Sequence, residues 1–262
     1  MKSLSVRWLT LSFLLLSLLE ISAYAGSINL GAAGSYGVLA GSTVTNTGSS
    51  VISGNLGVWP GSAVTGFPPG IVVGGTIHAG DAAAQAAQSA LTNAYNAAAG
   101  LAPTMNLTGQ NLGGLTLTPG VYFFSSSAQL TGVLTLNTLG NPNAQFVFQI
   151  GSTLTTASAS SIIFTSSLSS PNVFWQVGSS ATLGTGTAFA GNILALTSIS
   201  LNNGATISCG SALAQNGAVT LINNTISNNC GAVATTPEPG TVSLMGSGLA
   251  ILAGVLRRRR RT

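Results

Sequence analysis

Charge is nearly absent from this chain of 262 residues, which contains 7 Lys and Arg, 3 Asp and Glu and 1 His. All of the basic residues lie near the two ends, at Lys2, Arg7 and positions 257–261. Within residues 27–236 the only formally charged side chain is that of Asp81. Because nucleic-acid binding depends on a basic surface, this composition excludes DNA and RNA as partners of the central region.

The same scarcity argues against catalysis. An enzyme needs an acid, a base or a metal, and the central region offers only His78 and Asp81, three positions apart. It has no carboxylate pair for glycoside hydrolysis, no G-x-S-x-G elbow and no cluster with metal-ligand spacing. Trp59 and Trp175 could stack on sugars, but Trp175 lies in a strand pattern that favours the core. We interpret His78 as a satisfied turn residue and expect no enzyme activity, metal or cofactor.

The N-terminal segment has the sequence features of a secretory signal peptide. It begins MKS, continues with an apolar run over residues 8–19 and reaches the small-residue site AYA at 23–25. This order predicts a signal peptide over residues 1–25, with cleavage after Ala25.

The other end has three parts: Pro237, Glu238 and Pro239 precede an apolar stretch over residues 241–256, which runs into five arginines. As a helix the stretch would rise about 24 Å, which is short for a bilayer but workable with snorkelling arginines on the cytoplasmic side. This tail over residues 237–262 resembles the PEP-CTERM sorting signal of Gram-negative bacteria. The resemblance implies cleavage by an exosortase-type protease, with membrane contact only before cleavage. The alternative is a single-pass anchor.

Export places the central region at the cell surface or in the extracellular matrix of a Gram-negative bacterium. Cysteine is as scarce there as charge, with Cys209 and Cys230 both late in the region. An oxidising compartment permits a disulfide between them that would staple the last turns, and the alternative is two free buried thiols.

Residues 26–236 are predicted to form one all-β domain, because no long linker divides roughly 210 residues. Short runs of Val, Ile, Leu, Phe and Thr alternate with Gly, Asn and Ser, as in strands and turns. The exception is residues 81–99, where Ala and Leu recur at helical spacing. With Asp81 as the N-cap and Gly100 as the C′ residue, this segment predicts one helix whose alanine face packs along a sheet.

The later half of the domain repeats weakly. Leu183, Leu201 and Leu221 each end a short strand that is followed by a polar corner and a second strand. A period near 18 to 20 residues is what a triangular β-solenoid needs, with three strands and three corners per coil. Short alternating strands are also compatible with a β-sandwich.

Five segments in the same order resemble the microbial ice-binding-like family, which includes antifreeze proteins of bacteria, diatoms and fungi. The resemblance covers nearly all of residues 27–229. It implies an irregular right-handed β-solenoid of triangular section, with the long helix alongside and the N-terminal coil out of sequence order. The segments are GNLGVWPGSAVTGFPPG (54–70), GTIHAGDAAAQAAQSALTNAYNAAAG (75–100), LGGLTLTPGVYFFSS (112–126), NAQFVFQIGSTLTT (143–156) and NVFWQVGSSATLGTGTAFAGNILALTSISLNNGATI (172–207).

The resemblance also implies that one flat face meets ice through a Thr-(Ala/Gly)-X-(Thr/Asn) pattern. Only the first position and the small second position recur well here, which lowers the expected activity. Replacing Thr185 or Thr187 by tyrosine is expected to abolish ice activity and leave the fold intact. The candidate residues are Thr47, Ser49, Thr131, Thr156, Ser158, Thr185, Thr187, Asn203, Thr206, Asn223 and Thr225.

Two functions follow. In the first, the chain binds ice or ordered water through this Thr-, Ser- and Asn-rich face, as an antifreeze or recrystallisation inhibitor. In the second, the same scaffold is a structural or adhesive protein in exopolysaccharide, without ice activity. The regularity of the Thr rows distinguishes them, because a stiff row of methyl and hydroxyl groups can order water that mobile charges would disturb.

Overall fold

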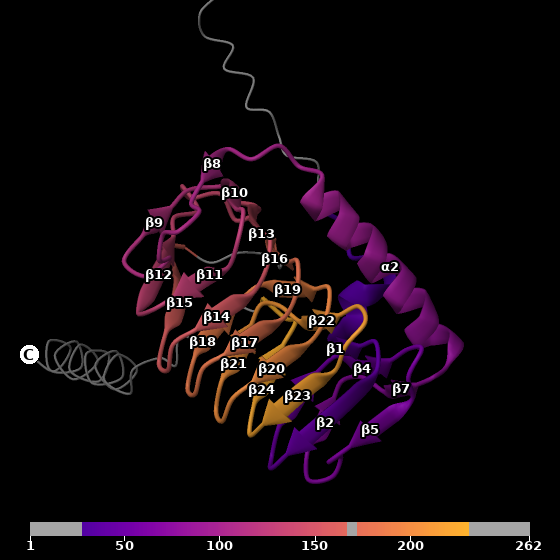
Figure 1. Cartoon of the computed structure of the whole chain (residues 1–262). Coiled ribbons are helices and arrows are strands. Elements are labelled where there is room, and N and C mark those ends of the chain that lie inside the picture. Colours follow the sequence, from indigo (N-terminus) through magenta and orange to yellow (C-terminus); the bar gives the residue numbers. More distant parts are fainter. Residues whose placement is uncertain (1–27, 167–171, 231–262) are drawn as a thin grey trace, which may run out of the picture.

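The computed structural model describes residues 28–166 and 172–230, which form a triangular β-solenoid with one long helix at its side (Figure 1). The predicted signal peptide, the apolar stretch 241–256 and the sorting residues 237–239 lie outside the described residues. Among the residues that are described, no helix is both long enough and apolar enough to cross a membrane.

Three parallel sheets form the sides of the solenoid, and each complete coil contributes one strand to each. Sheet A is ordered β7 (Ile77–Ala79), β4 (Asn55–Val58), β1 (Tyr36–Ala40), β22 (Ala212–Ala214), β19 (Asn192–Ala195), β16 (Val173–Val177), β13 (Phe146–Ile150), β10 (Gly120–Phe124) and β8 (Met105–Asn106). Sheet B is ordered β11 (Ala128–Leu130), β14 (Leu154–Thr156), β17 (Ala181–Leu183), β20 (Ile199–Leu201), β23 (Val219–Ile222), β2 (Thr43–Thr47) and β5 (Ala63–Thr65). Sheet C is ordered β6 (Ile71–Val73), β3 (Val51–Ser53), β24 (Thr225–Ser227), β21 (Thr206–Ser208), β18 (Ala188–Ala190), β15 (Ser161–Phe164), β12 (Val133–Leu136) and β9 (Thr116–Leu117). The predicted solenoid is confirmed, and the sandwich alternative is wrong.

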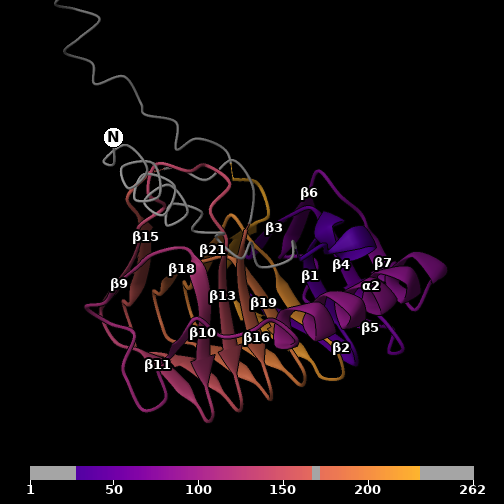
Figure 2. The same cartoon turned by 90° about the horizontal axis from the view of Figure 1, so that it is seen from above.

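The coils do not stack in chain order. The first coil, β1 to β3, lies between the last coil, β22 to β24, and the second, so that β1 pairs with both β22 and β4. After β7 the helix α2 (Ala82–Ala99) runs along the stack (Figure 2) and carries the chain to β8 at the other end (Figure 1). Later coils then wind back until the last one meets the first. This confirms the displaced N-terminal coil implied by the family resemblance.

The inner core is mainly aliphatic, and four of its aromatic rings form a run. Tyr122, Phe148, Trp175 and Phe189 contact one another in succession, and the Phe148 and Trp175 ring centroids are 3.8 Å apart. Trp175 is fully buried and its indole N–H donates to the carbonyl of Ala190 at 3.0 Å. The assignment of Trp175 to the core is confirmed.

Helix α2 covers the outer surface of sheet A. Its buried residues are Ala84, Ala87, Gln88, Leu91, Ala94 and Ala98. They pack on outward apolar side chains of the sheet, namely Leu39, Val121, Val147, Phe174, Leu194 and Leu213, together with the short helix η1 (Gly31–Ser35). The Asp81 carboxylate accepts from the Ala84 N–H at 2.9 Å, which confirms the predicted N-cap. Gly100 ends the helix with φ −83°, so the glycine is not in the left-handed region. No described helix covers the outer surface of sheet B or sheet C.

Candidate functional site

Sheet B carries a continuous outward row of polar side chains. In the short strands β14, β17 and β20 the first and last residues are buried and the middle one is exposed or half-buried. The strand register pairs these middle residues directly with one another, coil by coil. We call them the central row; in spatial order it consists of Gln129, Thr155, Thr182, Ser200, Thr220, Thr45 and Thr65.

A second row runs beside the first, two residues earlier in each coil. We call it the flanking row; it consists of Ser127, Thr153, Ser180, Ser198, Ala218, Thr43 and Ala63, all of them exposed or half-buried. Hydrogen bonds connect parts of it: the Thr153 hydroxyl donates to Ser127 Oγ at 2.9 Å, and the Ser198 N–H donates to Ser180 Oγ. Most positions of both rows are Thr or Ser.

The backbone sets the spacing of this two-row surface. Neighbouring strands lie about 4.8 Å apart, and alternate residues along a strand are about 6.6 Å apart. Threonine has a restricted χ1 angle, and the row residues alternate with buried side chains such as Leu154, Leu183 and Leu201. The hydroxyl and methyl groups are therefore held in a regular and stiff grid.

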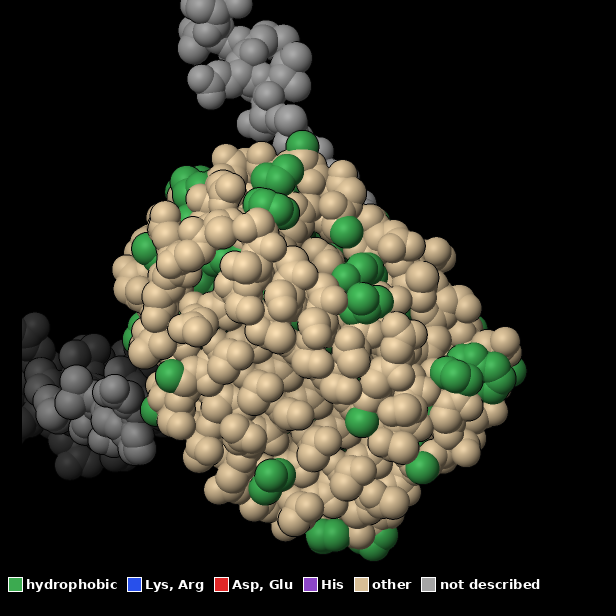
Figure 3. All heavy atoms as spheres, viewed as in Figure 1, with side chains coloured by type: hydrophobic (Ala, Val, Ile, Leu, Met, Phe, Trp, Pro, Cys, Tyr) green, Lys and Arg blue, Asp and Glu red, His purple; other side chains and the backbone are tan. Residues whose placement is uncertain are grey.

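No charged side chain interrupts this grid in the described part of the chain. Strands β14, β17, β20, β23 and β2 lie side by side in Figure 1, and the same view in Figure 3 is polar, with scattered apolar atoms and no Lys, Arg, Asp, Glu or His. The described imidazole, His78, lies in strand β7 of sheet A, and the described acid, Asp81, is the N-cap of α2.

The outer surface of sheet C has the same spacing but a different composition. The register aligns Ile71, Val51, Thr225, Thr206, Ala188, Ser161 and Val133 in one row. Ile71 is 52% exposed and Val133 44% exposed. Thr225 and Thr206 are neighbours, but aliphatic residues follow on both sides, so this row of sheet C is not a continuous row of hydroxyls.

The residues predicted from the family pattern do not share one plane. Most of the exposed ones lie at the corner between sheets B and C, in the turns that follow the sheet B strands or at the end of β2. Thr206 and Thr225 lie on sheet C instead. The corner residues are Thr47, Ser49, Thr131, Ser158, Thr185, Asn203 and Asn223.

Thr156 and Thr187 were predicted to face outward, and that prediction is wrong because both are buried. Their hydroxyl oxygens lie 2.7 Å apart. Thr156 Oγ1 also accepts from the Gly184 N–H, and Thr187 lies within hydrogen-bonding distance of the Ala157 carbonyl. A buried hydroxyl must be paired, and these two bind the inside of the corner together. Replacing Thr187 by tyrosine is therefore expected to disturb the core.

The central row was not predicted, although the sequence contained a signal for it. Thr182, Ser200 and Thr220 each stand immediately before the leucine on which the repeats align. Because side chains alternate along a strand, an inward leucine requires the preceding residue to face outward. Thr45 has no such leucine beside it, and only the pairing of β2 with β23 brings it into the row.

His78 and Asp81 form a local cap. The Nδ1 atom of His78 lies 2.8 Å from Asp81 Oδ2, and its Nε2 atom lies 3.2 Å from Thr76 Oγ1. The Ala84 N–H and the His78 hydrogen bond hold the pKa of Asp81 below its usual value of 3.8. His78 lies in strand β7, so the turn assignment is wrong, but both ring nitrogens are paired as expected.

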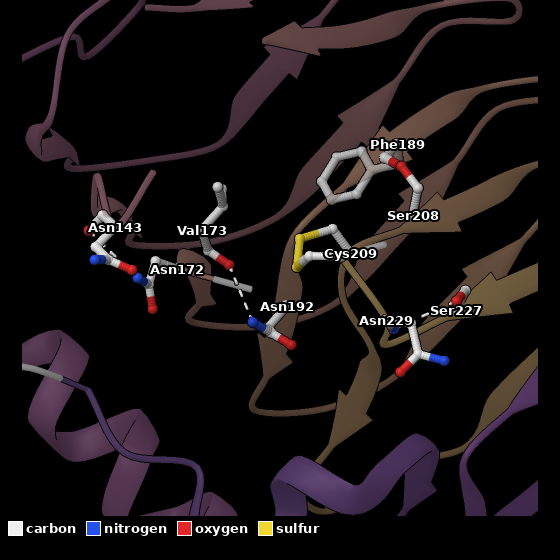
Figure 4. The surroundings of a disulfide bond; sticks show 10 residues. Asn143, Asn172, Val173, Phe189, Asn192, Ser208, Cys209, Ser227 and Asn229 are labelled. Atoms are coloured by element: carbon white, nitrogen blue, oxygen red, sulfur yellow. Dashed lines mark hydrogen bonds between the residues drawn. A yellow bond between two sulfur atoms is a disulfide. The ribbon is translucent and has the colours of Figure 1, made fainter. Parts of the chain in front are cut away.

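Cys209 and Cys230 form a disulfide at the corner between sheets C and A (Figure 4). Cys209 lies between β21 and β22, and Cys230 follows β24 in the next coil. Both pack against the inner core. The disulfide therefore ties the last coil to the one before it.

Residues 38–227 match the family described as Ice-binding-like, and residues 235–261 match the PEP-CTERM protein-sorting motif, a signal of surface export in Gram-negative bacteria. An ice-binding protein of Nostoc sp. (strain HG1) is 59% identical over 255 residues, covering 95% of this chain and 94% of that protein. An ice-binding protein of Colwellia sp. is 35% identical over 215 residues, covering 76% of this chain and 83% of that protein.

Solved structures agree in fold. An ice binding protein from an Antarctic biological consortium superposes with a TM-score of 0.73 at 47% identity, covering 76% of this chain and 90% of that one. An ice-binding protein from Arctic yeast superposes with a TM-score of 0.70 at 30% identity, covering 77% of this chain and 94% of that one. The match over residues 38–227, the similar ice-binding proteins and the shared fold show that the chain belongs to the ice-binding-like family.

Proposed function

We propose that this chain binds ice through the central and flanking rows of sheet B. The observation that carries the proposal is the unbroken register of the central row across seven parallel strands, six of which contribute Thr or Ser. The relatives named as ice-binding proteins support the same activity.

The physical argument rests on repetition and stiffness. Each hydroxyl can anchor one water, and the methyl group beside it favours ordered water over a loose hydration shell. Because the anchors repeat at about 4.8 Å along the row, the bound waters repeat as well and can match a crystal surface. A mobile charged side chain would break this layer, and neither row contains one.

We further propose that the mature protein comprises residues 26–236 and is held at the cell surface or in its exopolysaccharide. Removal of residues 1–25 by signal peptidase, and of the 237–262 tail by an exosortase-type protease at Pro237, Glu238 and Pro239, would leave a domain whose only formal side-chain charge is Asp81. The sorting motif supports this processing, and ice is the partner of the exposed domain.

The test compares two matched substitutions, Thr220→Tyr in the central row and Thr206→Tyr on sheet C. Both threonines are half-buried and lie in the middle part of their sheets. A tyrosine projects beyond a flat surface and prevents close contact, so Thr220→Tyr is expected to lose nearly all crystal shaping and recrystallisation inhibition. Thr206→Tyr is expected to keep both activities, and circular dichroism checks the fold of each variant.

Loss of activity in Thr206→Tyr alone would move the ice-binding surface to sheet C and contradict the proposal. A folded wild-type chain without any ice activity would instead favour the matrix or adhesive function of the same scaffold.

A further inference from the structure

A groove with a volume of about 240 Å³ lies at the corner between sheets A and B, outside both rows of sheet B. One wall is helix α2, which contributes Gln85, Gln88, Ser89 and Thr92. The other wall comes from two corner turns: Trp59 and Pro60 follow β4, and Gln215 and Asn216 follow β22. The ice-binding function proposed above does not use this groove.

Trp59 is the feature that distinguishes the groove. The other described tryptophan, Trp175, is fully buried and stacked on Phe148. Trp59 is only half-buried, belongs to neither hydrophobic core cluster and stacks on no aromatic ring in the described residues. A large indole that does not serve the core and lines a solvent-accessible groove is typical of a recognition site.

Apart from Pro60, the remaining side chains of the lining are uncharged amides and hydroxyls. Gln88 is buried, and its side-chain amide donates to the Ala214 carbonyl at 3.0 Å, so its position is fixed. Thr92 Oγ1 donates to the Gln88 carbonyl at 3.0 Å and lies 3.4 Å from Gln215 Oε1. These contacts hold the polar groups in place along the wall of the groove.

Gln215 has an unsatisfied polar atom at this site. Its Nε2 atom is buried and has no hydrogen-bond partner among the described residues. Exchanging the amide oxygen and nitrogen would leave the oxygen unpaired instead, so either assignment leaves one buried group that requires a partner. Because this atom is enclosed, the Gln215 side chain must turn toward the groove to reach a ligand hydroxyl, which both donates and accepts and would satisfy either arrangement.

We infer that this groove binds a neutral polysaccharide, with a sugar ring stacked on Trp59 and its hydroxyls bonded to Gln215 and the amides of α2. An indole provides the apolar face for the C–H side of a pyranose, and side-chain amides pair with adjacent hydroxyls. The lining has no cation to pair with a uronic acid or sulfate. This inference deepens the matrix part of the proposed function and is independent of the ice-binding rows.

The test is isothermal titration calorimetry of the proposed mature protein, residues 26–236, with cellohexaose, maltohexaose and a hexameric alginate. We expect a neutral hexaose to bind, and Trp59→Ala to weaken it about tenfold, as for a central tryptophan in an interface. Gln215→Leu is expected to weaken the same hexaose, whereas its matched control Gln129→Leu, on sheet B, leaves it unchanged.

Three results would overturn the inference: no binding of either neutral hexaose, binding of alginate alone, or equal affinity in wild type and Trp59→Ala. Ice assays keep the two proposals apart, because Trp59→Ala should retain crystal shaping and Thr220→Tyr should retain hexaose binding.

Discussion

Sheets B and C have the same parallel backbone, the same spacing and the same inner core, yet their outer surfaces differ. Sheet B presents Thr155, Thr182, Ser200, Thr220 and Thr45 in unbroken register. The corresponding row of sheet C is interrupted by aliphatic side chains, of which Ile71 and Val133 are about half exposed. The solenoid therefore provides two equivalent lattices, and only the outward residues determine which one is suited to hold ordered water.

Removing hydroxyl groups alone tests most directly whether they account for the difference between sheets B and C. Thr182→Val with Thr220→Val preserves shape and stiffness but removes two water anchors from the central row. Each lost hydrogen bond is worth about 1 kcal/mol, so ice affinity should fall by about tenfold or more. The control pair is Thr206→Val with Thr225→Val on sheet C, which should leave ice adsorption unchanged. Equal losses in the two pairs would show that the sheets act together.

Substitution of the buried Thr187 by valine sharpens the distinction between the inside and the outside of the corner. The loss of its bond to Thr156 should destabilise the fold by about 1–3 kcal/mol, which lowers Tm by roughly 3–10 °C. Ice activity per folded molecule should not change. Thr156→Val combined with Thr187→Val should cost less than the sum of the single variants, because no hydroxyl is then left unpaired. A loss of ice activity at unchanged Tm would instead indicate that Thr187 faces outward and contacts ice.

Acidity should have the smallest effect on the comparison, because neither row contains a titratable group. Since the folded pKa of Asp81 is lowered, its stabilising contribution is complete above the unfolded pKa and declines as pH falls through the lower folded value. Burial raises the pKa values of Tyr36 and Tyr122, so their contribution is lost as pH rises past their unfolded values. Ice activity should therefore be constant from about pH 4 to about pH 10. A change of ice activity with pH within this range would indicate that another surface binds ice.

The solenoid and its helix could be predicted because their signals are periodic: inward leucines repeat in the coils of the later half, and alanines repeat along α2. The position of the exposed rows could not be predicted in full, because threonine occurs on both the inner and the outer surface of sheet B. Thr156 is paired inside it and Thr155 faces outward, and the two are adjacent in the chain. The extension of the central row to Thr45 depends on contact between the first and last coils, which no local pattern reveals.

The Cys209–Cys230 disulfide gives the end of the described chain a second covalent connection to the solenoid. The described chain leaves the solenoid at the corner between sheets C and A, and in a triangular section that corner is opposite sheet B. Tension applied beyond residue 230 reaches β21 and β22 through the disulfide as well as β24 through the backbone. The load is thereby shared between two coils and does not peel one strand from the stack. A domain tethered at this corner turns sheet B away from its attachment, so the same feature supplies both a mechanical anchor and an orientation.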